Sequence, residues 1–402
     1  MKTEDIISEV DTYILGTYDR IPLTIKEGKG SWVWDNDGKK FLDFTTGIAV
    51  TNLGHNHSAL TGVIKNQAEK ILHSSNLFYL ESQAKLAKML VENSFANKVF
   101  FCNTGTEAVE GAIKFARKWG SENGGKYKIL STMGSFHGRT FGALSATGPS
   151  KYHEGFKPML EGFDFVPYGD AESVADYAKS SELCAIIVEP IQGENGVIVP
   201  ESGYLKDLRS ICNEQNLLLI LDEIQVGMGR TGTLFAYEHE GIEPDIMTLA
   251  KGLGGGVPCG AVLLNEKVAE QIKPGSHGTT FGGNPLAVSC AFETLKIINN
   301  NELLNSVGEL GRYFKEKLNQ LQTEYKELIT QVRGKGLILG IEFASADMAK
   351  KTIDKTISEG LLTIHTAGNV MRILPPLNTT KEEIDFALET INKSLKEVHS
   401  DA

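Results

Sequence analysis

Short apolar runs alternate with longer amphipathic stretches through the middle of this 402-residue chain. The runs have the length of strands and occupy residues 98–102, 127–132, 163–166, 184–188, 217–221, 246–249 and 261–264. Strands without polar alternation are typical of a sheet buried on both faces, and intervening helices indicate parallel pairing. The helices include residues 106–119 and a stretch from 286 to 298 that continues toward 321. The pattern predicts a large α/β domain with a mostly parallel central sheet.

The two ends of the chain carry a different pattern. Residues 31–34 and 40–44 alternate around a turn at 35–38 and predict a β-hairpin. Beyond residue 331, strand-like runs at 337–343, 361–365 and 370–374 precede a final helix, which begins after a capping-box pattern of Thr380 and Glu383. We therefore expect a smaller α+β domain formed by residues 1–60 and 326–402, with the large domain at 61–325.

Composition narrows the classes of function. A net charge of −11 argues against a protein that binds nucleic acid over an extended surface. The five cysteines form no paired motif, and His55 and His57 lack a third ligand at suitable spacing, so neither a disulfide framework nor a metal site is predicted. Without an apolar segment long enough for a membrane or a secretion signal, we expect a cytoplasmic protein.

The strongest chemical signal lies at the ends of two predicted strands. The run LLLILDEIQ ends in Asp222 and Glu223, and the run DIMTLA ends in Lys251 before a glycine-rich loop. Ligands of open α/β sheets bind at the carboxyl ends of strands. A lysine there can hold an aldehyde covalently, while a carboxylate can keep a pyridine nitrogen protonated, which together suggest pyridoxal phosphate. A solvated strand end is the plainer interpretation of Asp222 alone.

A phosphate site is predicted where the run KVFFC meets a helix. Residues 103–106, Asn-Thr-Gly-Thr, would bring backbone N–H groups, hydroxyls and the positive end of the helix to one point. Taken alone, these residues are better explained by an ordinary N-cap at Thr104 or Thr106.

The sequence GMGRTG at residues 227–232 offers a competing hypothesis of another class, a dinucleotide-binding oxidoreductase. It matches the GxGxxG fingerprint and follows a predicted strand. That fingerprint opens a helix directly from the strand, whereas here five residues, two of them acidic, intervene, and the following residues have no helical face. We therefore disfavour this interpretation.

Longer strings carry a resemblance to a known family. The sequences FCNTGTEAVEGAIKFAR, SFHGRT, VEPIQGENGV, LDEIQVGMGRTG, PDIMTLAKGLGGGVPCGA, HGTTFGGNP, VRGKGLILGIEF and MRILPPL follow one another over nearly the whole chain. In this order and spacing they resemble the class III, or omega, aminotransferases. The resemblance implies a fold type I pyridoxal-phosphate-dependent transferase that acts as a homodimer.

The resemblance also implies how the coenzyme is held. Lys251 would bind it covalently and then move a proton between the substrate and the coenzyme, and Asp222 would pair with the pyridine nitrogen. The other implied contacts are Gln225 at the phenolic oxygen, Gly105 and Thr106 at the phosphate, Thr280 of the partner subunit at the same phosphate, and Phe136 stacked on the ring.

Substrate contacts are implied for four residues. Arg139 would meet the α-carboxylate of the amino donor and the distal carboxylate of glutamate, and Thr279 would touch the substrate. Arg372 would bind the α-carboxylate of glutamate in a bidentate manner. Glu194 would neutralise Arg372 while the apolar donor chain is bound and swing away for glutamate.

The opening segment TYDRIPLTIKEGKGSWVWDNDGKKFLDFTTGIAVTNLGHNH is most like that of family members that act on acetylated ornithine. Ornithine-specific members carry tyrosine where Ile48 aligns. The resemblance thus implies transfer of the terminal amino group of N-acetylornithine to 2-oxoglutarate, in arginine biosynthesis. Ornithine, succinylornithine, diaminopimelate derivatives and 4-aminobutyrate remain alternative donors, because all present a terminal amine.

Overall fold

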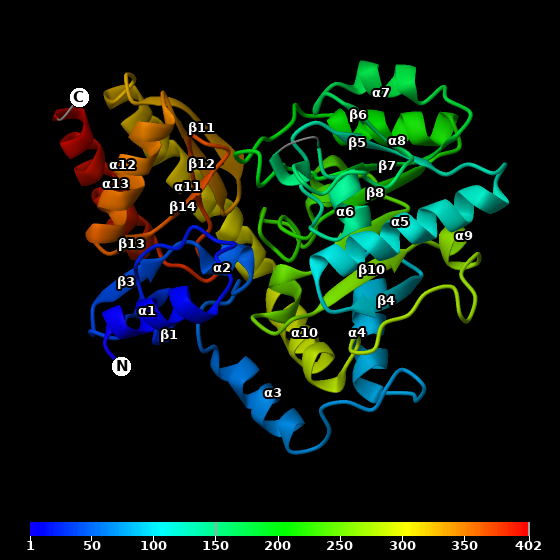
Figure 1. Cartoon of the computed structure of the whole chain (residues 1–402), viewed down its shortest axis with the longest axis horizontal. Helices are drawn as coiled ribbons and strands as arrows, with labels where there is room; N and C mark the ends of the chain where they lie inside the picture. The colour runs from blue at the N-terminus through cyan, green and yellow to red at the C-terminus, as the bar shows by residue number, and fades with distance from the viewer. Residues whose placement is uncertain (149–150, 401–402) are drawn as a thin grey trace.

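A seven-stranded sheet forms the centre of the larger part of the molecule in the computed structural model, which describes residues 1–148 and 151–400 (Figure 1). Strand β10 runs antiparallel to β4 and β9, and the other four neighbouring pairs are parallel. The prediction of a mostly parallel sheet is confirmed. In spatial order the strands are β4 (Lys98–Cys102), β10 (Gly260–Leu264), β9 (Ile246–Leu249), β8 (Leu218–Asp222), β7 (Leu183–Val188), β5 (Lys128–Thr132) and β6 (Phe163–Val166).

Helices cover both faces of this sheet, which explains its continuous apolar strands. In β8, Leu218 and Ile220 join the core formed with α5 (Gly105–Glu122). Leu219 and Leu221 join the opposite core, formed with α4 (Glu81–Glu92), α8 (Tyr204–Glu214) and α10 (Pro285–Ile298). Successive side chains of a strand point to opposite faces, so in a strand that is buried on both faces nearly every side chain lies in an apolar core.

Both ends of the chain build the smaller part, which lies beside the larger one (Figure 1). One sheet has the order β1 (Glu27–Lys29), β2 (Trp32–Trp34), β3 (Lys40–Asp43) and β13 (Leu361–Leu362), and its parallel β3–β13 pair joins the two ends. The other is antiparallel, in the order β11 (Ile329–Lys335), β12 (Ile338–Phe343), β15 (Val370–Ile373) and β14 (Ile364–Thr366). The predicted small α+β unit and its hairpin are present, while the boundaries after residues 60 and 325 stay a prediction.

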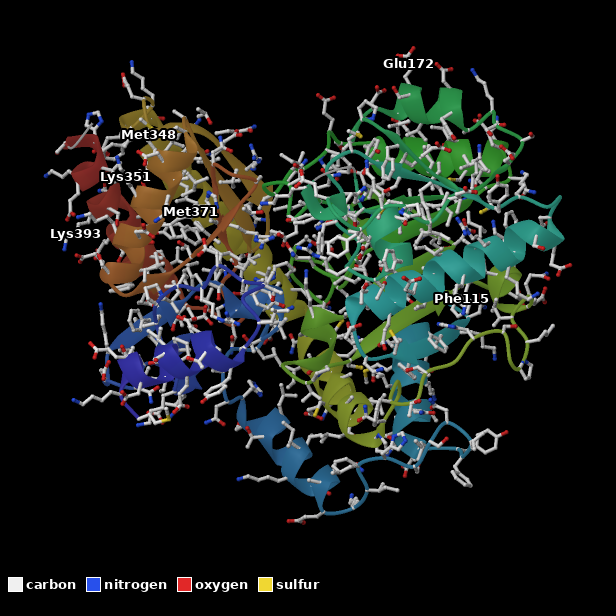
Figure 2. All side chains as sticks on the ribbon, in the orientation of Figure 1. Phe115, Glu172, Met348, Lys351, Met371 and Lys393 are labelled. Carbon is white, nitrogen blue, oxygen red and sulfur yellow. The ribbon has the colours of Figure 1, made fainter. Side chains whose placement is uncertain are left out.

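Helices α11 (Asn301–Glu324) and α12 (Ala346–Ser358) pack on the second of these sheets, and α13 (Lys381–Ser400) packs against both helices and completes the core. Among the residues that Figure 2 labels, Phe115 on α5 of the larger part and Met371 on β15 of the smaller part are both buried. The remaining helices are α1 (Thr3–Tyr13), α2 (Thr46–Ala49), α3 (Ser58–Ala68), α6 (Phe141–Ala146), α7 (Ala171–Tyr177) and α9 (Glu266–Ala269), with 3-10 turns at Lys151–His153, Ala236–Glu240 and Lys251–Gly254. No helix in the described residues is long and apolar enough to cross a bilayer.

Three details of the predicted elements are wrong. The helix from 286 does not continue toward 321, because the side chain of Asn300 accepts the N–H groups of Glu302 and Leu303 and starts a new helix. The run 361–365 is divided between two sheets. Strand β11 was not predicted, since its charged and polar residues break the apolar pattern.

Helix α11 approaches the β11–β12 turn so closely that it needs a residue without a side chain. A Cβ on Gly311 would lie 2.2 Å from the carbonyl oxygen of Gly336. Gly336 itself has a φ of +57°, a conformation that glycine adopts without strain. One turn earlier on the helix, a Cβ on Gly308 would have no neighbour closer than 3.6 Å.

These two glycines provide a matched test of the packing. We expect Gly311→Ala to destabilise the protein by about 1–3 kcal/mol through overpacking. Gly308→Ala should be neutral or stabilise it by up to about 1 kcal/mol through helix propensity. The thermal midpoints of both variants are measured with saturating coenzyme at one protein concentration. Equal shifts in the two variants would contradict the close packing at Gly311.

Candidate active site

A cavity of about 410 Å³ opens where the carboxyl ends of the central strands meet the start of α5. Eight of the residues proposed from the sequence line it: Gly105, Thr106, Phe136, Arg139, Glu194, Asp222, Gln225 and Lys251. Their positions in the chain span almost 150 residues, and the sheet order brings them together.

Asp222 is the last residue of β8 and is almost completely buried. One oxygen accepts hydrogen bonds from the Thr248 hydroxyl and the Ile224 N–H, both at 3.1 Å. The other lies 2.7 Å from Nδ1 of His137, whose Nε2 has no hydrogen-bond partner among the described residues. Burial alone would lower the pKa of His137, but Asp222 raises it above the ordinary value. The carboxylate is therefore fixed in one orientation.

Lys251 follows β9, the neighbour of β8, and faces the same cavity. Its backbone φ is +42°, which is rare for a residue with a side chain and is found mainly where structure enforces it. Desolvation lowers the pKa of the Lys251 amine, which increases the fraction in the neutral, nucleophilic form.

The start of α5 forms one wall of the cavity. Thr104 is the N-cap and exchanges reciprocal hydrogen bonds with Glu107. The following N–H groups, of Gly105 and Thr106, have no acceptor within the helix, as in the first turn of any α-helix. The Thr106 hydroxyl accepts the N–H groups of Arg139 and Thr140 at 3.2 Å and so joins this wall to the next loop. N-cap and anion site therefore coexist here.

Two arginines differ in their surroundings. Arg139 is exposed, with its guanidinium carbon 4.0 Å from the centre of the Tyr152 ring and 5.5 Å from that of Phe136. Arg372 is buried, and its Nη1 lies 2.7 Å from Oε1 of Glu194 and 3.1 Å from Oε1 of Gln225. Burial would raise the pKa of Glu194, but Arg372 holds it below the ordinary value. Arg372 reaches the cavity through these two contacts.

Thr279 and Thr280 do not line the cavity of their own chain. The Thr279 hydroxyl accepts a hydrogen bond from Asn103 at 3.3 Å, and Thr280 is exposed to solvent. Their roles toward substrate and phosphate stay predictions.

Sequence reasoning missed two buried groups in the cavity wall, His137 and Glu189. Glu189 directly follows β7 and accepts the N–H of Phe136 at 3.1 Å. Burial raises its pKa to about 7. The rule that singled out Asp222, a carboxylate at a strand's carboxyl end, applies equally to Glu189 and could have found it. By contrast, GMGRTG lies in a series of turns and opens no helix.

The family described as aminotransferase class-III matches residues 13–395. The chain belongs to this family. Acetylornithine aminotransferase of Caldanaerobacter subterraneus subsp. tengcongensis is 50% identical over 96% of this chain and 98% of its own length. That of Methanocaldococcus jannaschii is 47% identical over 99% and 100%. An ornithine aminotransferase structure from Toxoplasma gondii, described with partial occupancy of PLP at the active site, has a TM-score of 0.96 at 35% identity and covers 100% of this chain and 96% of its own.

Class-III aminotransferases depend on pyridoxal phosphate, and the cavity fits that coenzyme. It contains an amine with a lowered pKa, a fixed carboxylate, an aromatic ring and the N-terminus of a helix. These four groups match the aldehyde, the ring nitrogen, the ring face and the phosphate. The chain is thus a pyridoxal-phosphate-dependent enzyme of fold type I, as the sequence indicates.

Glu223, beside Asp222, gives the site a pH dependence of stability. It is fully buried and accepts the N–H groups of Ala236 at 2.6 Å and Tyr237 at 2.8 Å. Burial raises its pKa from 4.5 to about 8. Between these values the folded chain keeps a proton that the unfolded chain releases, so stability falls as pH rises through this window.

We expect Glu223→Gln to destabilise the protein most at pH 5, where the wild-type carboxyl is neutral. The difference in thermal midpoint between the two proteins should shrink toward pH 8, because glutamine does not titrate. A difference that stayed constant or grew with pH would contradict the raised pKa.

Proposed function

We propose that the chain transfers the terminal amino group of N-acetylornithine to 2-oxoglutarate, giving N-acetylglutamate semialdehyde and glutamate by a ping-pong reaction. The observation that carries this proposal is the ion pair of Arg372 with Glu194 in the wall of a cavity that Arg139 also lines. The full-length relatives named acetylornithine aminotransferase support the choice of donor.

The two substrates pose opposite electrostatic demands. N-acetylornithine has one carboxylate, distant from the reacting amine, and its methylene chain would lie against Arg372. A buried guanidinium facing an apolar chain is costly unless it is paired, and Glu194 supplies that pairing at 2.7 Å. Glutamate adds a second carboxylate at the reacting carbon. That carboxylate takes the place of Glu194, which is a quarter exposed and has room to turn toward solvent.

When bound, pyridoxal phosphate supplies an electron sink for the electrons of the broken C–H bond. Lys251 would hold the coenzyme, and its amine, once free, would move the proton from the substrate carbon. Asp222, oriented by His137, would keep the ring nitrogen protonated, and Phe136 would cover the ring face. Gly105 and Thr106 would bind the phosphate. Gln225, whose side-chain carbonyl accepts a hydrogen bond from Arg372, would lie at the phenolic oxygen.

Arg139 is placed to receive the carboxylate that lies far from the reacting carbon. It is exposed, forms no ion pair within the described part of the chain, and is held at the cavity by its N–H bond to Thr106. In both half-reactions it would meet a distal carboxylate: the α-carboxylate of N-acetylornithine and the side-chain carboxylate of glutamate.

A homodimer is part of the proposal. Leu77, Phe78 and Tyr79 form an apolar run that is 66–106% exposed, and Phe281, beside Thr279 and Thr280, is 61% exposed. Asn76 joins the two segments by donating to the carbonyls of Thr279 and Gly282. Contiguous exposed apolar side chains mark an interaction surface. A second copy covering it would let Thr280 reach the phosphate of the partner's site.

The proposal is tested by comparing terminal amines in single-turnover reactions with the coenzyme-loaded enzyme. We expect kcat/KM for N-acetylornithine to exceed the values for ornithine, succinylornithine, succinyl-diaminopimelate and 4-aminobutyrate. The result depends on the groups that surround the reacting amine, which differ among the five donors. A higher value for any other donor would reassign the substrate.

The switch is tested by Arg372→Ala. We expect about a hundredfold loss of kcat/KM for glutamate, on the order of 3 kcal/mol, because a buried bidentate partner of its carboxylate is removed. The N-acetylornithine half-reaction should lose far less, since Arg372 is then paired with Glu194. Equal losses in the two half-reactions would refute the switch.

A further inference from the structure

Arg230, the arginine of the GMGRTG turns, is completely buried, although it lies outside the cavity wall. Its Nη1 donates hydrogen bonds to the carbonyl oxygens of Leu337 at 3.0 Å and Pro375 at 2.5 Å. Its Nη2 donates to the side-chain oxygen of Asn52 at 2.5 Å. One guanidinium thus binds three segments that are 107 to 178 residues distant from it in the chain.

None of these acceptors is a carboxylate, and Arg230 forms no ion pair within the described residues. Burial lowers its pKa to about 9, and no nearby acid offsets this effect. A buried cation without a counter-ion is costly, and its planar fork is compensated only when every acceptor is held in place. The arrangement is therefore sensitive to the positions of all three segments.

Two of the acceptors flank β15, the strand that carries Arg372, and its neighbour β12. Leu337 immediately precedes β12, and Pro375 follows β15 by two residues. In the β12–β15 pair, Arg372 lies opposite Gly340. By binding the adjacent ends of these two central strands, Arg230 fixes one end of the strand pair only three residues away from Arg372.

The third acceptor connects the same guanidinium to the neighbourhood of Lys251. The side-chain amide of Asn52 donates to the backbone carbonyl of Met228 at 3.3 Å, and the backbone carbonyl of Asn52 accepts the N–H of Leu377 at 2.8 Å. A Cβ on Gly252, the residue after Lys251, would lie 2.3 Å from the Asn52 amide nitrogen. Asn52 therefore packs directly against the backbone that presents the lysine.

We propose that Arg230 is a positioning residue that sets the separation between Arg372 and Lys251. It thereby determines how well the enzyme binds a dicarboxylate substrate that has one of its carboxylates on the reacting carbon. The inference rests on the proposed role of Arg372 toward glutamate. Arg139 is attached to α5 and its neighbouring loop through Thr106, not to the segments that Arg230 joins. A shift of the small sheet would consequently disturb glutamate and 2-oxoglutarate more than the monocarboxylate donor.

The test replaces Arg230 with lysine, which keeps the charge but cannot reach three acceptors with a planar fork. With coenzyme-loaded Arg230→Lys, normalised to active sites, we expect kcat/KM for glutamate to fall about tenfold or more. The value for N-acetylornithine should change less than about threefold. The dissociation constant of glutarate, an unreactive dicarboxylate, should rise about tenfold in calorimetry.

Two further variants separate positioning from a general loss of stability. Asn52→Ala removes one acceptor and should show the same selective effect, which keeps the inference testable if Arg230→Lys folds poorly. Arg209→Lys is the matched control. Arg209 lies on α8 and binds Asp245 at 2.8 Å and the carbonyl of Glu243, so these contacts join parts of the large domain to each other. We expect it to lower the thermal midpoint without changing the ratio of the two half-reactions.

Equal losses for both substrates in Arg230→Lys and Asn52→Ala, or an unchanged glutarate affinity, would overturn the positioning role. The wild-type enzyme is measured first, and a preference for another amine would contradict the proposed donor alone. The comparison of glutamate with that amine would still decide the role of Arg230.

Discussion

The parallel pairing of β8 with β9 is the contact on which the rest of the site depends. Asp222 lies opposite Thr248 in this pair, and Lys251 follows three residues later. Sliding the register would carry Asp222 away from both Thr248 and His137, and a slip of one residue would also turn alternate side chains to the wrong face. The cores on the two faces prevent this, because each leucine and isoleucine of β8 already fills a place in one of them. Packing far from the chemistry thereby fixes the distance between a carboxylate and an amine.

Two carboxyl groups in the cavity wall, Glu189 and Asp222, are each held by several local hydrogen bonds. Glu189 accepts backbone N–H groups from Phe136 and Gly193, and Asp222 accepts three hydrogen bonds in all. Such contacts fix direction as well as charge. In a medium of low dielectric constant, fixed dipoles cost no reorganisation when charge moves during a reaction. This explains why a site for proton transfer is built from so many buried polar groups.

Local sequence patterns predicted the large sheet, and they singled out Asp222 and Lys251, which the structure brings to one cavity. Most residues of these strands are apolar, and Asp222 and Lys251 follow two of the most apolar runs, where ligands of open α/β sheets bind. Strand β11 escaped prediction because only one of its faces is apolar, and the break at Asn300 because an asparagine cap inside an amphipathic pattern is a weak signal. The partners of Arg230 could not be predicted at all, since all three lie more than 100 residues away and two of them are backbone carbonyls, which every residue possesses.

The carbonyl partners of Arg230 have a consequence for how the enzyme tolerates its surroundings. Carboxylates gain protons as the medium becomes acidic, and exposed ion pairs weaken as ions accumulate. Amide oxygens do not gain protons over this range, and ions in the medium have little access to the buried guanidinium that they bind. The three acceptors that Arg230 uses are amide oxygens, so none of them titrates. This one connection between the two parts of the molecule therefore keeps its acceptors unchanged as the medium becomes acidic, whereas the nearby ion pair of Arg372 depends on the charge of Glu194.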